Sequence, residues 1–271
     1  MRDYLVFQLY GPLVAWGDIA VGETRPSAMT PTKSAVLGLV AAALGLRRPD
    51  TARAETERDE WESCQIALAK GYGMAVKMET MGLPLSDYHT VQVPSSGSGR
   101  NHKVFSTRRD ELTHGNKFDL NTIISRREYR QDAFYAVALW ARTTAPHTLH
   151  ELRHALLEPC FTLYLGRKSC PLALPLQPEV KSAETVEDAL ASMHLEGILA
   201  RVAEAGGNAG WANLYMRFQP SAHLLFWDGD AETRLLPEQT NTRRDATLSR
   251  RRWQFTVRDE HQTHLGQGGQ L

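Results

Sequence analysis

The sequence predicts an α+β protein with a ferredoxin-like domain, a long protruding insertion and a small, irregular C-terminal part. Two strand–helix–strand patterns follow one another before residue 178, which is the element order of a ferredoxin-like fold. Roughly forty residues separate the two patterns, far more than a compact domain needs to join neighbouring strands. Beyond Pro178 the expected elements become shorter and less regular.

The first pattern begins at the N-terminus. Tyr4 to Leu9 is rich in aromatic and aliphatic residues and stops at a Gly-Pro pair, which indicates a buried strand. Ser34 to Leu44 carries apolar residues at helical spacing and ends at a glycine. A more acidic helix is expected from Thr56 to Ala69, and two glycines then release the chain into a strand from Met74 to Thr80.

The second pattern repeats the order of the first. Phe134 to Trp140 is a strand by the same criteria, and Thr148 to Leu157 places three leucines on one helical face. Glu158-Pro159 ends this helix, and Phe161 to Leu165 is expected to form the fourth strand.

The segment between the patterns, Pro84 to Arg127, predicts an arm. Its flanks, Tyr88 to Val93 and Val104 to Thr107, are expected to pair as a hairpin. Ten extended residues on each side would project about 30 Å from the body. Long loops of this kind commonly carry function, so we expect the arm to contact another molecule.

The region beyond Pro178 predicts a second unit. An acidic helix is expected from Thr185 to Glu204, followed by short strands at Leu214–Phe218, Leu224–Trp227 and Trp253–Val257. The domain prediction is therefore residues 1–178, with an insertion at about 84–127, and a smaller region at 179–271.

Charge is balanced overall and segregated locally. The 31 Lys and Arg residues equal the 31 Asp and Glu residues, which argues against a protein that coats nucleic acid indiscriminately. Acids collect between Asp50 and Glu62 and between Glu179 and Glu204. This pattern suits one polyanion-facing surface on a neutral body. The basic clusters are Arg126-Arg127 with Arg130, Arg167-Lys168, Arg243-Arg244 and Arg250-Arg251-Arg252.

Several classes of protein are disfavoured. The N-terminus has no charged leader and apolar block, and no stretch has the apolar length of a membrane span, so we expect a cytoplasmic protein without a membrane partner. Cys64, Cys160 and Cys170 are widely spaced and predict neither a disulfide framework nor a zinc site. The chain has no carboxylate pair, His cluster or Gly-rich loop, which predicts that it binds no metal and no cofactor.

A series of short strings follows a fixed order along residues 1 to 175. The strings are Gly11-Pro12, Ala15-Trp16-Gly17, Thr24-Arg25-Pro26, Pro31-Thr32-Lys33-Ser34, Leu37-Gly38-Leu39, Asp87-Tyr88-His89-Thr90, Arg127-Glu128-Tyr129, Asp132-Ala133, Val137-Ala138-Leu139-Trp140 and Tyr164-Leu165-Gly166-Arg167-Lys168-Ser169-Cys170-Pro171-Leu172. Any one string is a weak signal, but their order is specific. In this order they resemble the Cas-five-type subunits of type I-E CRISPR Cascade complexes, members of the RAMP superfamily.

The resemblance implies an RRM-like domain with a thumb hairpin. It also implies a role without catalysis: holding the 5′ handle of the guide RNA (crRNA) and capping the backbone of an antiviral DNA-targeting complex. The implied partners are the crRNA, a Cas-seven-type backbone subunit and the large Cascade subunit, with target DNA reached indirectly through guide pairing.

Three chain segments are candidates for RNA contact, because single-stranded RNA needs phosphate partners and stacking platforms. The first is the helix start at Lys33 and Ser34, where N–H groups, a hydroxyl and an ammonium suit an anion; alternatively, Thr32 only caps the helix and Lys33 is solvated. The second segment contains Arg126, Arg127 and Tyr129, which supply guanidiniums and an aromatic ring. The third is the turn from Gly166 to Ser169, which supplies two cations after a glycine. Solvated surface residues are the alternative for both. The full predicted set is Arg25, Lys33, Ser34, Tyr88, His89, Arg126, Arg127, Tyr129, Gly166, Arg167, Lys168 and Ser169.

Tyr88 and His89 admit a second hypothesis. A Tyr or His acting as general base, with a cation beside the phosphate, can cleave RNA without a metal. The enzymatic alternative is therefore an endoribonuclease that processes crRNA precursors, although the type I-E resemblance implies that a different subunit cuts. The Arg243–Arg252 cluster is left open between nucleic acid, a neighbouring subunit and solvent.

Overall fold

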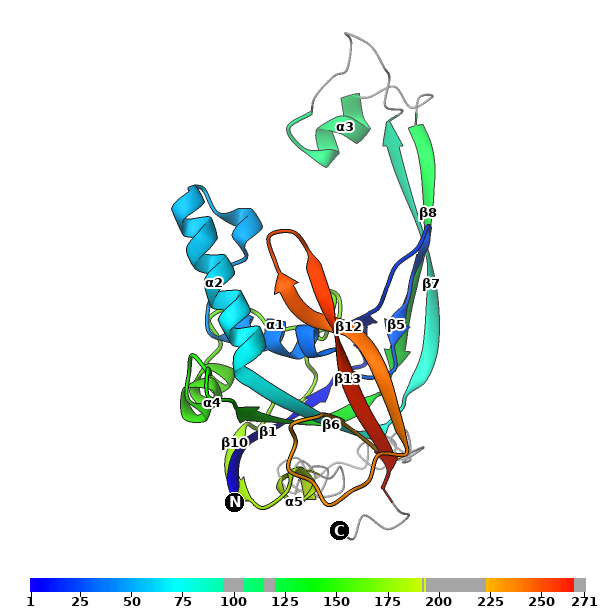
Figure 1. Cartoon of the computed structure of the whole chain (residues 1–271). Helices are drawn as coiled ribbons and strands as arrows, with labels where there is room; N and C mark the ends of the chain where they lie inside the picture. Colours follow the sequence, from blue (N-terminus) through cyan, green and yellow to red (C-terminus); the bar gives the residue numbers. More distant parts are fainter. Residues whose placement is uncertain (95–104, 115–119, 192, 194–222, 266–271) are drawn as a thin grey trace, which may run out of the picture.

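The body is built on one antiparallel sheet of seven strands. The computed structural model describes residues 1–94, 105–114, 120–191, 193 and 223–265. The sheet order is β10-β1-β9-β6-β11-β13-β12, with every neighbouring pair antiparallel (Figure 1). The strands are β1 (Arg2–Tyr10), β6 (Tyr72–Thr80), β9 (Phe134–Ala141), β10 (Glu179–Ala183), β11 (Leu224–Asp228), β12 (Gln239–Ser249) and β13 (Gln254–His264).

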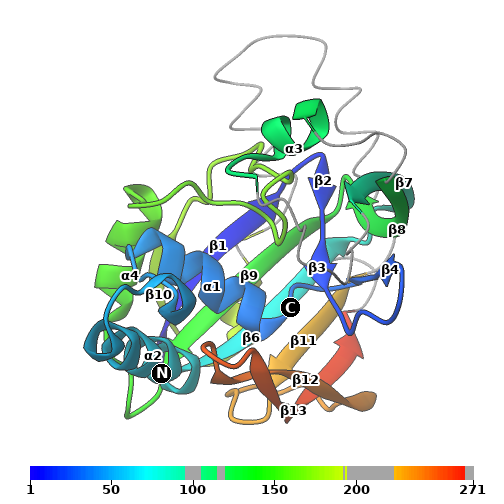
Figure 2. The same cartoon turned by 90° about the horizontal axis from the view of Figure 1, so that it is seen from above.

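Both faces of the central strands are covered, which explains their continuous apolar sequences. In β1, Leu5, Phe7 and Leu9 belong to one core cluster, whereas Tyr4 and Val6 belong to the other. Successive side chains of a strand point to opposite faces, so a strand that is buried on both sides is apolar at most positions. The larger cluster lies under α1 and α4, and the smaller lies against α5 (Figures 1 and 2).

The helices follow their sequence signals. Thr32 caps α1 by accepting from the Ala35 N–H, and Thr148 with Glu151 forms a capping box at the start of α4. No described helix has the length and hydrophobicity needed to cross a lipid bilayer. The helical elements are α1 (Lys33–Ala43), the 3₁₀ turn η1 (Pro49–Thr51), α2 (Glu55–Gly71), α3 (Arg108–His114), α4 (Leu149–Leu157) and α5 (Val186–Ala191).

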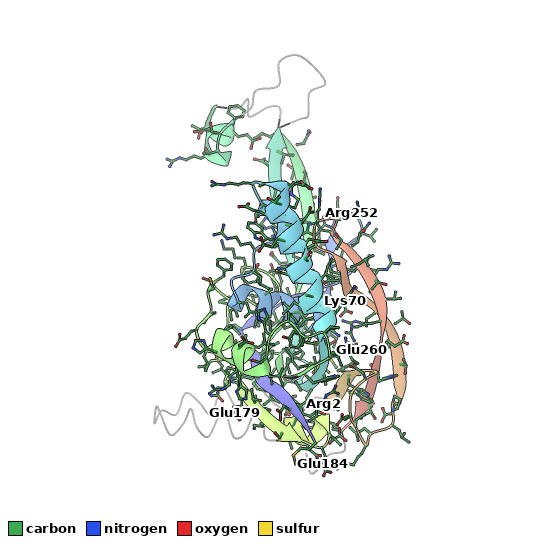
Figure 3. All side chains as sticks on the ribbon, turned by 60° about the vertical axis from the view of Figure 1, so that its left-hand side comes forward. Arg2, Lys70, Glu179, Glu184, Arg252 and Glu260 are labelled. Carbon is green, nitrogen blue, oxygen red and sulfur yellow. The ribbon has the colours of Figure 1, made fainter. Side chains whose placement is uncertain are left out.

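The insertion forms an arm, with a different partner strand from the one predicted. β7 (Leu83–Pro94) pairs with β8 (Leu120–Gln131) over twelve residues each, a ladder of about 40 Å that projects from the body (Figures 1 and 3). The expected pairing with Val104–Thr107 is wrong: residues 105–107 are not extended and lead into α3. The true partner is β8. Because it contains charged residues, the sequence pattern predicted the end of a loop there and not a strand.

Short strands join the arm to the body. β2 (Leu13–Val14) and β4 (Thr24–Arg25) both pair with β8, and β3 (Trp16–Gly17) pairs with β5 (Ser27–Ala28). The base of β8 is therefore held between segments from the first thirty residues and β7.

The fourth predicted strand is also wrong. Phe161–Leu165 forms only an isolated bridge between Tyr164 and Pro171, and the strand beside β1 is β10. The strands at Phe134–Trp140 and Met74–Thr80, and the helices of both patterns, are confirmed to within two or three residues at each end.

Beyond Pro178 the sheet continues without interruption. β10, β11, β12 and β13 extend the same sheet that contains β1, β6 and β9, so the sheet crosses the position at which the sequence was divided. Of the helix expected at Thr185–Glu204, the structure describes α5; residues 194–204 and the expected strand at Leu214–Phe218 lie outside the described residues. β11 and β13 correspond to the other two expected strands.

Candidate nucleic-acid interface

The start of α1 is occupied by the protein's own acids. The Lys33 side chain is 4% exposed and forms an ion pair with Asp228. The Lys33 backbone N–H donates to the Asp245 carboxylate at 2.7 Å, so this carboxylate takes the place at the helix N-terminus that was predicted for an RNA phosphate. Burial lowers the pKa of the Lys33 ammonium, and Asp228 opposes that shift. Lys33 is therefore withdrawn from the surface.

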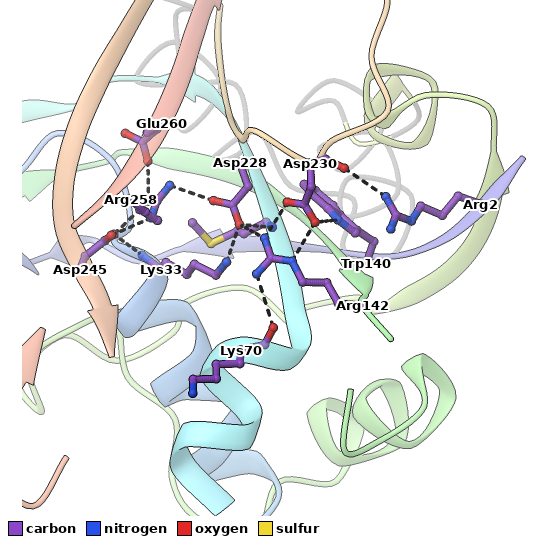
Figure 4. A network of polar contacts seen from close by, with 11 residues as sticks. Arg2, Lys33, Lys70, Trp140, Arg142, Asp228, Asp230, Asp245, Arg258 and Glu260 are labelled. Atoms are coloured by element: carbon purple, nitrogen blue, oxygen red, sulfur yellow. Dashed lines mark hydrogen bonds and ion pairs between the residues drawn. The ribbon is translucent and has the colours of Figure 1, made fainter. Parts of the chain in front are cut away.

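Lys33 belongs to a buried ionic network that joins α1 to the C-terminal strands (Figure 4). The guanidinium of Arg258 contacts Asp245 at 2.7 Å, Asp228 at 2.9 Å and Glu260 at 2.7 Å. Burial would lower the pKa of Arg258, but these acids raise it above its ordinary value. Asp245 lies where the β12–β13 register shifts, and such a bulge can redirect a side chain.

Arg142 extends the network to β9. Its guanidinium contacts Asp230 at 2.6 Å and Asp228 at 3.2 Å, while the Trp140 indole N–H donates to Asp230 at 3.2 Å. Burial raises the pKa of Asp230, but the hydrogen bonds from Arg142 and Trp140 outweigh it and bring that pKa to about 2.

A second group of arginines converges at the base of the arm. Arg25 on β4 lies opposite Arg127 on β8, and residues in register on adjacent strands share a face of the sheet. The Arg167 guanidinium stacks on the Tyr129 ring, 4.6 Å from its centroid. Arg167 also donates to the carbonyl oxygens of Arg25 and Glu128, both at 2.9 Å. We call Arg25, Arg127, Tyr129 and Arg167 the arm-base cluster.

Acid partners do not neutralise the outer part of this cluster. Arg25 is exposed and bonds only to carbonyl oxygens of its own loop, and Arg127 is half-buried. Neither residue forms an ion pair with any residue that the structure describes, and the same holds for the exposed side chains of Arg126 and Lys168. Asp87 lies opposite Arg127 on β7 but forms no ion pair with it, and the exposed side chains of Arg25, Arg126 and Lys168 are accessible to an external anion.

Gly166 is required by its surroundings. Its φ is +86°, and a Cβ at this position would lie 1.8 Å from the carbonyl oxygen of Ala15. The turn that follows exposes Lys168 and Ser169 and buries Cys170. Burial raises the pKa of the Cys170 thiol, as expected for a packed residue.

Tyr88 and His89 do not share a face of the arm. Tyr88 is opposite Arg126 and His89 is opposite Ser125, and consecutive residues on a strand point to opposite sides. Tyr88 is 59% exposed. The two side chains therefore cannot act together on one phosphate while β7 is extended. His89 lies on the face of Arg25, Arg127 and Tyr129, whereas Tyr88 lies with Arg126 on the other.

A groove of about 1300 Å³ runs beside the arm-base cluster. It lies between α1, the 161–166 segment and the β12–β13 hairpin, and Ser34 and Gly166 both line it. Two of the predicted segments thus meet at one concavity, although Lys33 does not. The groove is also lined by Arg47, Arg48, Tyr164, Arg243, Arg244, Arg250, Trp253 and Phe255.

Sequence reasoning missed Arg48, Trp253 and Phe255, and left the role of Arg250 open. The signal available in the sequence was a run of three arginines followed by two aromatic residues within six positions, Arg250 to Phe255. Basic residues interleaved with aromatic ones are typical of surfaces that bind single-stranded nucleic acid. The sequence does not show that the β12–β13 hairpin places this run beside α1.

Comparisons with known proteins agree on one family. The family described as CRISPR-associated protein (Cas_Cas5) matches residues 4–260. The "CRISPR system Cascade subunit CasD" of Escherichia coli (strain K12) is 39% identical over 176 residues, which is 65% of this chain and 70% of that protein.

Solved structures support the same fold. A chain of a "CRISPR RNA-guided surveillance complex" has a TM-score of 0.55 at 19% identity, covering 96% of this chain and 89% of its own. A structure described as "Crystal structure of Cas protein" also has a TM-score of 0.55, at 21% identity, with 98% and 96% covered.

Proposed function

Because this chain belongs to the CRISPR-associated protein (Cas_Cas5) family, we propose that it is a non-catalytic, RNA-binding subunit of a type I-E Cascade complex. In this role it grips the 5′ handle of the guide RNA and caps the backbone of the antiviral complex in the cytoplasm. Its neighbours are a Cas-seven-type subunit and the large subunit. The family predicted from the ordered strings is the family found.

The fold fits this proposal. We assign β10-β1-β9-β6, with α1 and α4, to a ferredoxin-like, RRM-like unit of the RAMP type, because its strands alternate with helices in the order that fold requires. The β7–β8 arm is the thumb hairpin of this assignment.

One observation carries the proposal: Arg25, Arg127 and Arg167 converge beside the Tyr129 ring at the base of the arm, and Gly166, the neighbour of Arg167, lines a groove with further arginines. Arginines and an aromatic ring supply phosphate partners and stacking platforms, which is what an unpaired RNA end requires. Catalysis is not part of the proposal. Tyr88 and His89 lie on opposite faces of the arm, which disfavours only an endoribonuclease that uses both residues on one phosphate.

The test is binding of a labelled single-stranded repeat RNA in EDTA, measured over a range of salt concentrations. Arg25→Ala and Arg127→Ala are expected to weaken binding several-fold and to reduce the slope of log affinity against log salt by roughly 0.7 for each phosphate that the protein no longer neutralises. Arg58→Ala is the matched control, because Arg58 pairs with Glu55 on α2, away from the cluster.

Two results would contradict the proposal. A salt-independent interaction, or equal binding by Arg127→Ala and Arg58→Ala, would favour a protein adaptor whose basic residues meet acidic partners. A cleavage product that disappears in Tyr88→Phe or His89→Ala would favour the endoribonuclease.

A further inference from the structure

The groove contains a guanidinium without an acid partner. Arg250 donates to the carbonyl oxygen of Ser34 at 3.0 Å, and among the residues described here no carboxylate forms an ion pair with it. The nearby acid, Glu62, instead accepts from the backbone N–H groups of Arg250 and Arg251, at 3.1 and 3.0 Å. A partly buried charge without a counterion is costly, which is expected where a ligand supplies the anion.

The environment of the Arg250 guanidinium disfavours its positive charge. Burial lowers the pKa of Arg250, and the positive charge of Arg48 adds to the shift, while Glu62 opposes it. Arg250 is thus held in a position that its own protein environment disfavours. Its guanidinium lies between two aromatic rings, 5.8 Å from the centroid of Trp253 and 5.5 Å from that of Phe255.

Trp253 is an unusual residue for its position. It has a φ of +52° in the turn between β12 and β13, where a glycine or asparagine is ordinarily found. Its side chain is 52% exposed, and Arg48 lies 5.3 Å from its ring centroid. A bulky ring kept exposed in a strained turn points to a role at the surface. The neighbouring Arg252 marks the end of this hairpin beside α2 (Figure 3).

We propose that Arg250 and Trp253 form a subsite for one nucleotide of single-stranded RNA, with its phosphate on the Arg250 guanidinium and its base stacked on the indole. Arg48, which is paired with Asp50 at 3.0 Å, borders this subsite. This inference rests on the proposed function and extends it to a place on the C-terminal hairpin. The groove is large enough for a nucleotide, and the hydroxyls of Thr32, Ser34 and Tyr164 line it as further hydrogen-bonding groups.

The test compares RNA affinity in three variants of the full chain. Trp253→Gly removes the ring and relieves the positive φ, so it is expected to keep the melting temperature while weakening binding roughly 5- to 150-fold. Trp253→Phe keeps an aromatic face and is expected to retain most of the affinity. Arg250→Met is expected to reduce the salt slope by about one phosphate contact, whereas Trp253→Gly leaves the slope unchanged.

Arg251→Ala is the matched control, because this neighbouring arginine is paired with Glu55 and Asp59 and does not line the groove. In addition, RNA carrying 4-thiouridine is expected to cross-link to the peptide that contains Trp253.

The results distinguish the proposed RNA-binding function from the proposed nucleotide subsite at Trp253. If Arg127→Ala weakens binding but Trp253→Gly binds like the wild type, the subsite is wrong and the proposed function stands. If Trp253→Gly binds RNA normally but no longer co-purifies with a Cascade subunit, the hairpin contacts protein instead. If the wild type binds no RNA, both inferences fail.

Discussion

Replacing Arg258 with alanine is expected to destabilise the fold strongly. The Arg258 side chain is 10% exposed and contacts three carboxylates at 2.7 to 2.9 Å. Those of Asp228, Asp245 and Glu260 are 5%, 6% and 2% exposed, so water cannot replace the missing cation without a rearrangement. The variant therefore leaves buried acids with too little positive charge.

The magnitude follows from the cost of breaking a buried ion pair. Removing one partner typically costs about 3–5 kcal/mol, because an uncompensated charge remains in the interior. For a protein of this size each kcal/mol lowers the melting temperature by about 2–3 °C, which gives roughly 6–15 °C.

The assay is thermal and urea unfolding of the wild type, Arg258→Ala and the control Arg251→Ala. The Arg251 side chain is 41% exposed and its partners are more so, so its removal is expected to cost below about 1 kcal/mol. Equal stability of the two variants would refute the reasoning.

Three further results are expected. Gly166→Ala should cost at least about 2 kcal/mol in urea unfolding, because its Cβ would overlap the Ala15 carbonyl at a positive φ; a neutral result would contradict the turn geometry. Asp230→Asn should flatten the loss of stability that the wild type shows as pH falls from about 4 to 2, since the folded pKa of about 2 lies below the ordinary value; unchanged acid unfolding would contradict it. A thiol reagent should modify the exposed Cys160 quickly and the buried Cys170 only on unfolding, as mass spectrometry of digested peptides would show.

The strands that could be predicted from the sequence are those that are buried on both faces of the sheet. β1, β6 and β9 lie between two core clusters, so apolar residues run through most of each strand, and the buried Lys77 of β6 is paired with Glu79. α1 and α4 carry side-chain caps that sequence reading detects directly. These signals are local, and no distant residue is needed to interpret them.

The elements that sequence patterns miss depend on distant partners. β10 reads Glu-Val-Lys-Ser-Ala and lies at the edge of the sheet, so it lacks the apolar run that Phe161–Leu165 presents. β8 contains Arg126, Arg127 and Glu128, and its strand character arises from pairing with β7 and the short N-terminal strands. Charged residues of this kind are favourable where one side of a sheet meets solvent or a ligand.

Lys33 shows that the partners of a site residue, too, cannot be predicted from the neighbouring sequence. Its neighbours in sequence are those expected of an anion-binding helix start, and Thr32 does cap the helix. Its actual partners, Asp228 and Asp245, lie 195 and 212 positions further along the chain. No local pattern reveals that a C-terminal hairpin brings acids to this helix. Two of the three candidate segments do meet, since Arg167 stacks on Tyr129, whereas the segment of Lys33 contributes its ammonium to the buried ionic network instead.

The ionic network and the basic surface together explain how a chain with no net charge can present cations to a polyanion. Arg142, Arg258 and Lys33 are matched by buried acids, and these pairs fix the β12–β13 hairpin over α1. Arg250 has no described acid partner and lines the groove that this hairpin completes, whereas Arg127 belongs to the arm-base cluster outside that groove. The acids are thus concentrated where they hold the groove together, which leaves positive charge on its walls. Net charge is a poor guide to such a protein, whereas the pairing of each cation with an acid separates those that support the fold from those that can meet RNA.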